Sequence, residues 1–190
     1  RVDKRLSSGH TVFTRAVENA APEMLVPLLM APGVELNKPA PNGLLPIQIA
    51  VVRQDLDVIR LLLDHGADPM LLNNNESALG FALIGRDRDI IRIIVEHPVT
   101  DLNRSQRFNE SVLAGAARLG DLDVVDLLLA RGANPRKFDQ FGRPPVWAAY
   151  GSGKREVVER ILKAAPEMAD VVDLAGMRLK DFEKIFGKPE

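Results

Sequence analysis

The sequence predicts an all-α protein built from stacked helix-turn-helix units. Three observations predict it: a pair of apolar segments recurs along the 190 residues, the interval is nearly constant, and a polar extension follows each pair. Periods of about 20 to 50 residues are typical of repeat proteins, in which each unit buries its apolar face against its neighbours. The sequence therefore predicts a solenoid whose units each contain a short helix, a tight turn, a longer helix and a polar loop.

The repeat is clearest in two units. Residues 43–50 (GLLPIQIA) are followed by LDVIRLLL at 56–63 and by HGADP at 65–69. The same order returns later in the chain, at 111–117, 122–129 and 131–135.

Equivalent positions give the length of the repeat. Five residues begin the first apolar segments: Thr11, Leu45, Ser77, Ser111 and Pro144. They are 34, 32, 34 and 33 residues apart, and in every unit the second apolar segment ends 18 residues after this position. Chance does not keep five units in register across most of a chain, so we interpret the pattern as a true repeat.

The second segment of each unit is too apolar for a helix with a free surface. In the second unit, the segment contains Val58, Ile59, Leu61, Leu62 and Leu63. Such a helix has to be covered on more than one side, and stacked neighbours provide that cover. Burying four such side chains per repeat, at about 1.5–3 kcal/mol each, stabilises an array but not a lone unit.

The turns before the first helices carry residues suited to a positive φ. Gly43 and Gly142 stand two residues before the first helices of their units, where we expect the turn to require this conformation. Asn75 and Asn109 take the corresponding place in two other units, and asparagine is the next most tolerant residue there.

The two ends of the chain are expected to close the array. The first unit is irregular, with Pro27 inside its second helix, where the missing N–H should bend the helix. At the other end the register continues, and Gly176 stands where Gly142 stands in the unit before. We therefore expect a sixth half-repeat over 173–187, which is one amphipathic capping helix stopped at Gly187.

Aspartates and histidines recur with the repeat and are expected to cap helices. Asp55, Asp87 and Asp121 each precede a second helix, where a carboxylate accepts hydrogen bonds from free N–H groups. His65 and His97 end successive second helices, which in a stack lie about 8–10 Å apart. That separation is too large for both rings to bind one metal ion at about 2 Å, so we expect C-terminal caps.

One short motif resembles part of a phosphate-binding loop. Residues 151–154 read GSGK, but the full motif requires glycine at position 148, where Ala148 stands, and Ser or Thr in place of Arg155. In the repeat register this segment is the turn between two helices. Because the chain also has no cysteine and only three histidines, the sequence predicts no catalytic residue, no cofactor and no metal site.

Composition limits the kind of partner. The chain has 25 Lys and Arg against 26 Asp and Glu, a formal net charge of −1, whereas a generic nucleic-acid or membrane-surface binder needs excess positive charge. No apolar stretch approaches the roughly 20 residues of a membrane-spanning helix. With 46% apolar and 27% charged residues the chain should be globular, and neither nucleic acid nor membrane is an expected partner.

The period near 33 resembles that of ankyrin repeats, whose pattern is T-P-L-H-x-A, then G-x-L-x-V-V-x-L-L-L, then G-A-D, although no single unit here has the full signature. The resemblance is best in the second and fourth units, and the third has His97-Pro98-Val99 in place of Gly-Ala-Asp. It covers about residues 8–186. It implies a single domain, 1–190, with repeats at approximately 8–40, 41–73, 74–106, 107–139 and 140–172 and the capping helix at 173–187.

The resemblance also implies a function. Ankyrin-like arrays bind proteins through a concave surface of finger loops and first helices, so the expected function is a non-catalytic protein-interaction module that is monomeric by itself and cytoplasmic. Carried over position by position, the implied contact residues are Leu44, Val52, Arg53, Glu76, Ile84, Arg107, Phe108, Glu110, Arg118, Leu119, Phe141 and Arg143. Several are apolar at positions expected to face solvent, as is typical of an interface, although some could pack under neighbouring fingers instead.

Two alternatives remain at this stage. The chain could be the substrate-recruiting segment of a larger enzyme, such as a bacterial effector acting in the host cytoplasm, whose catalytic domain lies outside this sequence. The absence of an initial Met fits a fragment. Trp147, which replaces the usual His of the first helix, is expected to pack in the core, with a ligand platform as the alternative.

Overall fold

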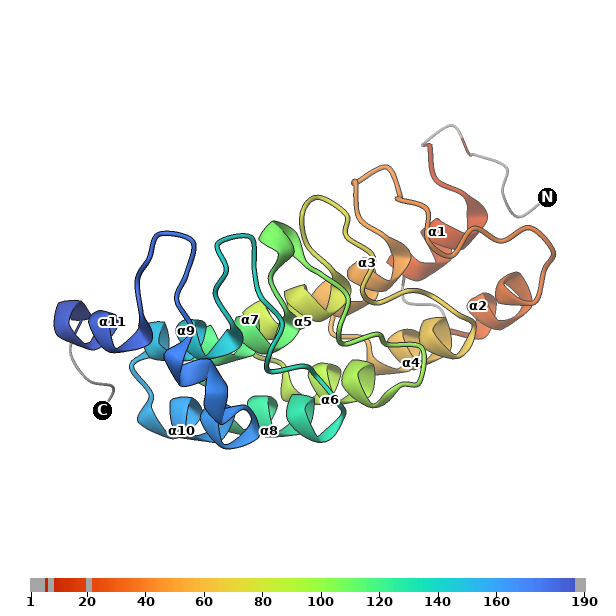
Figure 1. Cartoon of the computed structure of the whole chain (residues 1–190). Coiled ribbons are helices and arrows are strands. Elements are labelled where there is room, and N and C mark those ends of the chain that lie inside the picture. The colour runs from red at the N-terminus through yellow and green to blue at the C-terminus, as the bar shows by residue number, and fades with distance from the viewer. Residues whose placement is uncertain (1–5, 7–8, 20–21, 187–190) are drawn as a thin grey trace. The chain divides into compact units, whose positions relative to one another are not determined.

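The computed structural model describes residues 6, 9–19 and 22–186 (Figure 1). The chain divides into two compact units, Arg1–Thr100 and Asp101–Glu190, and each is described by itself. Gly187, the expected end of the last helix, and residue 8, the expected start of the first repeat, lie outside the described residues.

The first unit consists of helix pairs arranged in two layers. The first helices of its repeats are α1 (Val12–Glu18), α3 (Pro46–Val52) and α5 (Ala78–Gly85), and the second helices are α2 (Pro22–Leu29), α4 (Leu56–Asp64) and α6 (Arg88–Glu96). Helix α3 packs against α1 and α5, while α4 packs against α2 and α6. The loops that lead into α3 and α5 extend as fingers beyond the layer of first helices (Figure 1).

The second unit repeats this arrangement. Its first helices are α7 (Val112–Leu119) and α9 (Pro145–Ser152), its second helices are α8 (Leu122–Ala130) and α10 (Arg155–Ala164), and its last helix is α11 (Leu179–Phe186). Two short 3-10 helices, η1 (Arg107–Asn109) and η2 (Pro166–Asp170), lie in its loops. Helix α7 packs against α9 and α8 against α10, while η2 lies between α10 and α11.

The described residues form no β-strand, and isolated bridges pair Asn73 with Glu76 and Val172 with Arg178. The predicted all-α fold is therefore confirmed. The five positions that define the repeat in the sequence are the residues directly before the first helices.

The predicted N-caps are confirmed. The side chains of Asp55, Asp87 and Asp121 accept hydrogen bonds from the backbone N–H three residues later, at 3.1, 3.1 and 3.3 Å. At Leu45, which has no polar side chain, the buried Gln48 accepts the Leu45 N–H at 2.9 Å instead. The helices that follow these three aspartates therefore satisfy part of their unpaired first turn locally.

The two histidines also occupy the predicted helix ends. His65 is the C-cap residue of α4, and its Nδ1 lies 2.8 Å from the carbonyl oxygen of Leu61. His97 is the C-cap residue of α6, where Nδ1 accepts the N–H of Val99 at 3.3 Å and Nε2 lies 3.2 Å from Asp64. The His65 ring therefore contacts the end of its own helix, whereas the His97 ring also joins α6 to Asp64 at the end of α4.

The turn residues have the backbone conformation that the sequence predicts. The φ angles of Gly43 and Gly142 are 81° and 75°, and those of Asn75 and Asn109 are 65° and 58°. Residues 151–154 lie at the junction of α9 and α10, as the repeat register requires, and form no phosphate loop.

The core lies between the two helix layers. In α4, Val58, Ile59, Leu62 and Leu63 are buried, and Leu61 is half-buried. This distribution matches the prediction that the helix is covered on more than one side. No helix in the described part of the chain is both long enough and apolar enough to cross a membrane.

Replacing Leu62 with alanine should lower the free energy of unfolding by about 2–5 kcal/mol, because the side chain is fully buried and its removal leaves a cavity. Chemical denaturation measures the effect. The control is Arg60→Ala on the exposed side of the same helix, which we expect to change stability by about 0.5 kcal/mol or less. Equal denaturation midpoints for Leu62→Ala and the wild type would contradict this assignment of the buried face.

Candidate functional site

In the first unit, the expected contact residues lie at the ends of the first helices and on the fingers. Val52 and Ile84 take equivalent places near the ends of α3 and α5, and both side chains are exposed, by 59% and 65%. Arg53, the C-cap residue of α3, is also exposed, whereas Leu44 on the finger is half-buried. Because α3 and α5 pack side by side, the ends of these helices form one continuous edge.

Glu76 makes more contacts with the helices around it than the sequence indicates. Its Oε1 accepts the N–H of Ser77 at 3.1 Å, and its carbonyl oxygen accepts Nε2 of Gln48 at 2.8 Å. The carboxylate lies so close to α5 that a Cβ at Gly80 would collide with it. Glu76 therefore holds the finger against the helices of two repeats, and its carboxylate is only half-buried.

Two phenylalanines occupy the finger tips of the second unit. Phe108 and Phe141 are 53% and 50% exposed. The carbonyl oxygen of Phe108 accepts the N–H of Gln140 at 3.1 Å, and that of Phe141 accepts the N–H of Leu174 at 2.9 Å. The backbone of each phenylalanine is thus held by the next finger, while half of the side chain is left in solvent.

Phe108 has a strained backbone. Its φ and ψ are 58° and 27°, a left-handed conformation that costs a non-glycine residue about 1–2 kcal/mol. The guanidinium carbon of Arg107 lies 4.4 Å from the centroid of the Phe108 ring. The following residue, Asn109, also has a positive φ and donates from Nδ2 to the carbonyl oxygen of Phe138 at 3.1 Å. Hydrogen bonds between fingers therefore support the strained tip.

Arg143 lies between two aromatic rings and a buried carboxylate. Its Nε and Nη2 donate to Asp173 Oδ2 at 2.9 and 2.8 Å. Its guanidinium carbon is 5.6 Å from the centroid of Phe141 and 5.3 Å from that of Trp147. The sequence places Arg143 among the contact residues, and about a third of its side chain is exposed. The structure shows that Arg143 also joins two successive fingers through Asp173.

Asp173 is the acid of this cluster, and the sequence analysis did not single it out. Its side chain is 1% exposed, and Oδ1 accepts the N–H groups of Ala175 and Met177, both at 2.9 Å. Burial alone would raise the pKa of Asp173, but the hydrogen bonds from Met177, Arg143 and Ala175 hold the pKa below its ordinary value. In the preceding finger, Asp139 Oδ1 accepts the N–H groups of Phe141 and Arg143 at 2.8 and 3.0 Å, so an aspartate at equivalent finger positions was the available signal.

A hollow of about 170 Å³ lies below these fingers in the second unit. Arg118 and Glu110, which form an ion pair, line one side, and Arg143 and Trp147 line the other. Trp147 is 4% exposed, so the prediction that it packs in the core is confirmed. Leu119, at the end of α7, is half-buried. The hollow is large enough to receive one side chain of a partner.

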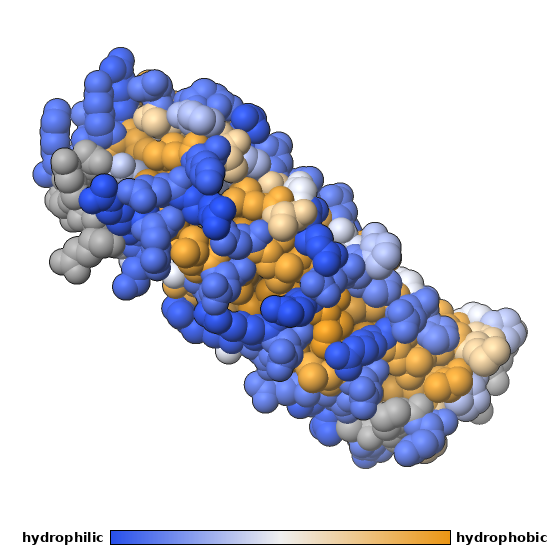
Figure 2. Space-filling model, turned by 90° about the horizontal axis from the view of Figure 1, so that it is seen from below, coloured by the Kyte–Doolittle hydropathy of each residue, from blue (hydrophilic) through white to orange (hydrophobic). Residues whose placement is uncertain are grey.

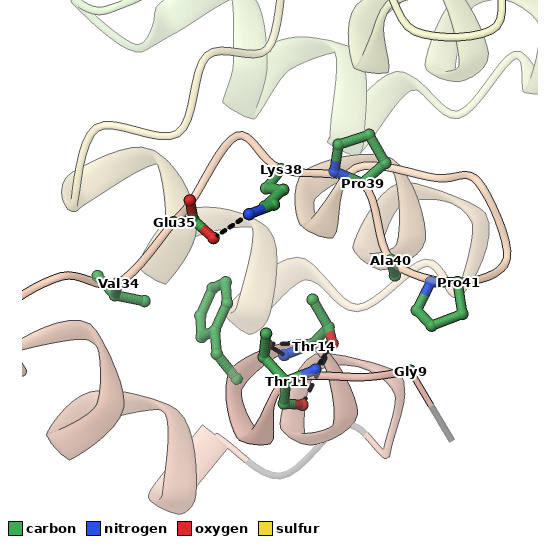
Figure 3. Close-up of a pocket in the computed structure, with 10 residues that line it drawn as sticks. Gly9, Thr11, Thr14, Val34, Glu35, Lys38, Pro39, Ala40 and Pro41 are labelled. Atoms are coloured by element: carbon green, nitrogen blue, oxygen red, sulfur yellow. Dashed lines mark hydrogen bonds and ion pairs between the residues drawn. The ribbon is translucent and has the colours of Figure 1, made fainter. Parts of the chain in front are cut away.

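A second pocket lies in the first unit, between α1 and the loop before α3 (Figure 3). Its free volume is about 10 Å³, which is enough for roughly one water molecule. Thr11 and Thr14 cap the helix beneath it, and Glu35 pairs with Lys38 at 2.7 Å above it. Within the described residues, no cluster of three or more acidic or histidine side chains is placed to hold a metal ion.

Comparison with known sequences identifies the class of protein. Residues 13–106 match the family described as ankyrin repeats in three copies, and residues 110–140 match a further ankyrin repeat. The chain belongs to the ankyrin repeat family. Ankyrin repeats are generally protein–protein interaction modules, and the fold is typically non-catalytic.

Two curated relatives are cation channel subunits. The chain is 29% identical over 126 residues to the human transient receptor potential cation channel subfamily A member 1 and 28% identical over 129 residues to its homolog from Caenorhabditis elegans. The matches cover 66% and 67% of this chain but only 11% of each relative. The chain thus spans about a tenth of the length of these proteins.

Two solved structures have the same fold. The ankyrin repeat protein EF0377 superposes with a TM-score of 0.74 at 24% identity, over 96% of this chain and 94% of its own. The ankyrin repeat domain of Bcl-3, a member of the IkappaB family, superposes with a TM-score of 0.80 at 23% identity, over 93% and 81%. These similarities confirm the predicted ankyrin-repeat solenoid.

Replacing Asp173 with asparagine should lower the free energy of unfolding at pH 7 by about 1.5–3 kcal/mol, because the bonds from Arg143 lose their charged acceptor. The pKa of Asp173 is lowered on folding, so its carboxylate stabilises the fold above the unfolded pKa. The difference between variant and wild type should shrink as the pH falls through about 4 and vanish below the folded pKa. Urea titrations at several pH values, with the exposed Asp57→Asn as control, test this; a difference that grows toward acid would contradict it.

Replacing Phe108 with asparagine should leave the free energy of unfolding unchanged or raise it by up to about 1.5 kcal/mol. Asparagine relieves about 1–2 kcal/mol of left-handed strain, while losing the Arg107 contact costs about 0.5–1 kcal/mol. The matched variant is Phe141→Asn, whose backbone is not left-handed and which should gain nothing. If thermal unfolding showed Phe108→Asn to be the less stable of the two variants, the strain assigned to Phe108 would be wrong.

Proposed function

We propose that this chain is a non-catalytic module that binds a protein partner through its finger tips and the inner ends of its first helices. The observation that carries the proposal is the pair of half-exposed phenylalanines, Phe108 and Phe141, on successive fingers. Aromatic side chains and arginines are the usual anchors of protein interfaces. The family to which the chain belongs supports a binding function, and its typical lack of catalysis supports a non-enzymatic one.

The surroundings of the two rings favour an anchor site. The 170 Å³ hollow, which Arg143 also lines, is bordered by the Arg118–Glu110 ion pair, whose arginine is 55% exposed, so a polar group of the partner can reach it. Arg107 and Arg143 lie against the rings and keep them in place. A partner side chain seated in the hollow would contact Trp147 together with the cationic groups of Arg118 and Arg143.

The first unit offers a second, more aliphatic contact area. Val52 and Ile84 are exposed apolar residues at equivalent positions, and Arg53 follows Val52 directly. Exposed apolar side chains that recur at one edge support an interaction surface. Leu44, Glu76 and Leu119 are half-buried, and we assign them to the rim of the surface. We also propose that the module acts as a monomer in the cytoplasm, as the family resemblance implies.

The double variant Phe108→Ala/Phe141→Ala should weaken partner binding at least about tenfold, because truncating anchors typically costs about 2 kcal/mol or more. Pulldown with mass spectrometry identifies the partner, and calorimetry with that partner measures the loss. Circular dichroism should show unchanged helicity, since the rings are half in solvent.

The control for this experiment is Glu159→Ala/Lys163→Ala on the exposed face of α10. Both pairs lie in the second unit, so the comparison tests the face of the molecule rather than the region. Loss of binding in the α10 variant together with full binding in the phenylalanine variant would move the interface to the second helices.

A further inference from the structure

The second helix of the first repeat, α2, presents apolar side chains to solvent. Met24, Val26 and Met30, the residue that follows the helix, are 56%, 44% and 76% exposed, and Glu23 is the one charged residue of α2. The outward positions of α4 and α6 carry charges instead. Arg60 and Arg92 stand where Val26 stands, and Asp64 and Glu96 stand where Met30 stands. A helix that is apolar on all sides is typical of a buried helix.

Comparison with the other repeats shows which part of this surface is unusual. Met24 stands where the next two repeats have Val58 and Ile90, which are both 1% exposed. In the second unit, where α8 precedes α10, the equivalent Val157 is also fully buried. The position is therefore a core position wherever a repeat precedes it within the same unit.

Two neighbouring positions behave in the same way. Leu28 is half-buried, whereas its equivalents Leu62 and Ile94 are fully buried. Val12, at the start of α1, is 37% exposed, whereas its equivalent Ala78 is 1% exposed. The set Val12, Met24 and Leu28, which we call the α1–α2 end face, is thus apolar at three positions that the other repeats bury. Figure 2, which views the molecule from below, shows apolar surface among polar side chains along the whole visible face, including the right side, where α1 and α2 lie in Figure 1.

The stacking within the unit explains what these positions do. Helix α4 packs against α2 and α6 packs against α4, and in each case the later repeat buries its equivalents of Met24 and Leu28. Terminal repeats of solenoids need a polar outer face, which α11 shows with its exposed Lys180 and Lys184. Val12, Met24 and Leu28 carry no charge, whereas Arg15 of the same helix α1 is 55% exposed at the position where the next repeat buries Ile49. The outer side of repeat 1 is therefore polar at one core position and apolar at three.

We propose that the α1–α2 end face is an interface for a further helix-turn-helix repeat of the same polypeptide, stacked on α1 and α2 as these helices stack on α3 and α4. The interface needs aliphatic side chains on the incoming helices, because the face itself presents only Val, Met and Leu. This surface differs from the finger surface of the proposed function, and the two proposals stand or fall separately.

A stacked repeat would cover Met24 but not Met30, and this pattern distinguishes it from other occupants of the face. A preceding repeat should cover Met24, because Val58 and Ile90 are covered in this way. It should leave Met30 open, because Asp64 and Glu96 remain exposed although repeats precede them. An occupant that covered the whole of α2 would protect both methionines.

The experiment compares methionine oxidation in two chains. One is the chain as it is, and the other carries a copy of residues 41–73 joined directly ahead of residue 8, in place of residues 1–7. Both are treated with hydrogen peroxide, and mass spectrometry follows each sulfoxide. Met70, which is 1% exposed, provides the buried reference in the same molecule. We expect Met24 and Met30 of the original chain to react at least about tenfold faster than Met70, since oxidation follows exposure.

In the extended chain, Met24 should slow by about tenfold or more while Met30 stays within about twofold. In the extended chain, Val12→Asp should restore the oxidation of Met24, because it places a charge in the proposed interface. Helix α1 should still form, since an acidic residue in the first turn favours a helix. The control Val26→Arg, which copies the residue of the next two repeats, should leave Met24 protected.

Three results would overturn the proposal. One is an extended chain in which Met24 is unprotected and reacts as fast as Met30. Another is an extended chain in which Met24 and Met30 are both protected. The third is protection of Met24 in the original chain that increases with protein concentration, which would assign the face to a second copy.

Discussion

Burial of the second helices between neighbouring repeats is the interaction on which the rest of the structure depends. In α4 the fully buried Leu62 and Ile59 cannot be covered by their own repeat, because a lone helix pair covers only one side. Each repeat is therefore stable only as part of a stack. The fingers and first-helix ends, where the candidate contacts lie, contribute little to this burial and can carry residues selected for binding.

The fingers are held by a second set of interactions, which are polar and run from one repeat to the next. In the first unit, Gln48 joins α3 to the finger of Glu76, and in the second unit Asp173 receives Arg143 from the preceding finger. Backbone bonds such as that from Gln140 to Phe108 complete the set. Because these bonds lie at the base and edge of the loops, they order the backbone and leave the tips accessible.

The features that recur in each repeat are predictable from the sequence, whereas the contacts between particular fingers are not. The period, the helix starts, the Asp55-type caps and the buried Leu62 position all recur with chemical regularity, so one sequence was sufficient to predict them. The Arg143–Asp173 pair and the left-handed Phe108 depend on how one finger meets the next. The aspartates at 139 and 173 recur with the repeat, but their spacing does not reveal that Arg143 pairs with Asp173. The predicted exposure of apolar side chains is found at Val52 and Ile84, whereas Leu44 and Leu119 are half-buried.

The attachment of Phe108 has an evolutionary consequence. The next finger holds this residue by its carbonyl oxygen, a group that every amino acid possesses, and its side chain has no part in that bond. Asn74 takes the corresponding place in the preceding repeat with a similar φ of 52°. The hydrogen bond to the next finger therefore survives a change of the tip residue, and the left-handed φ is what limits the residues that this position accepts. The inheritance of the frame is to that extent separate from the inheritance of binding specificity.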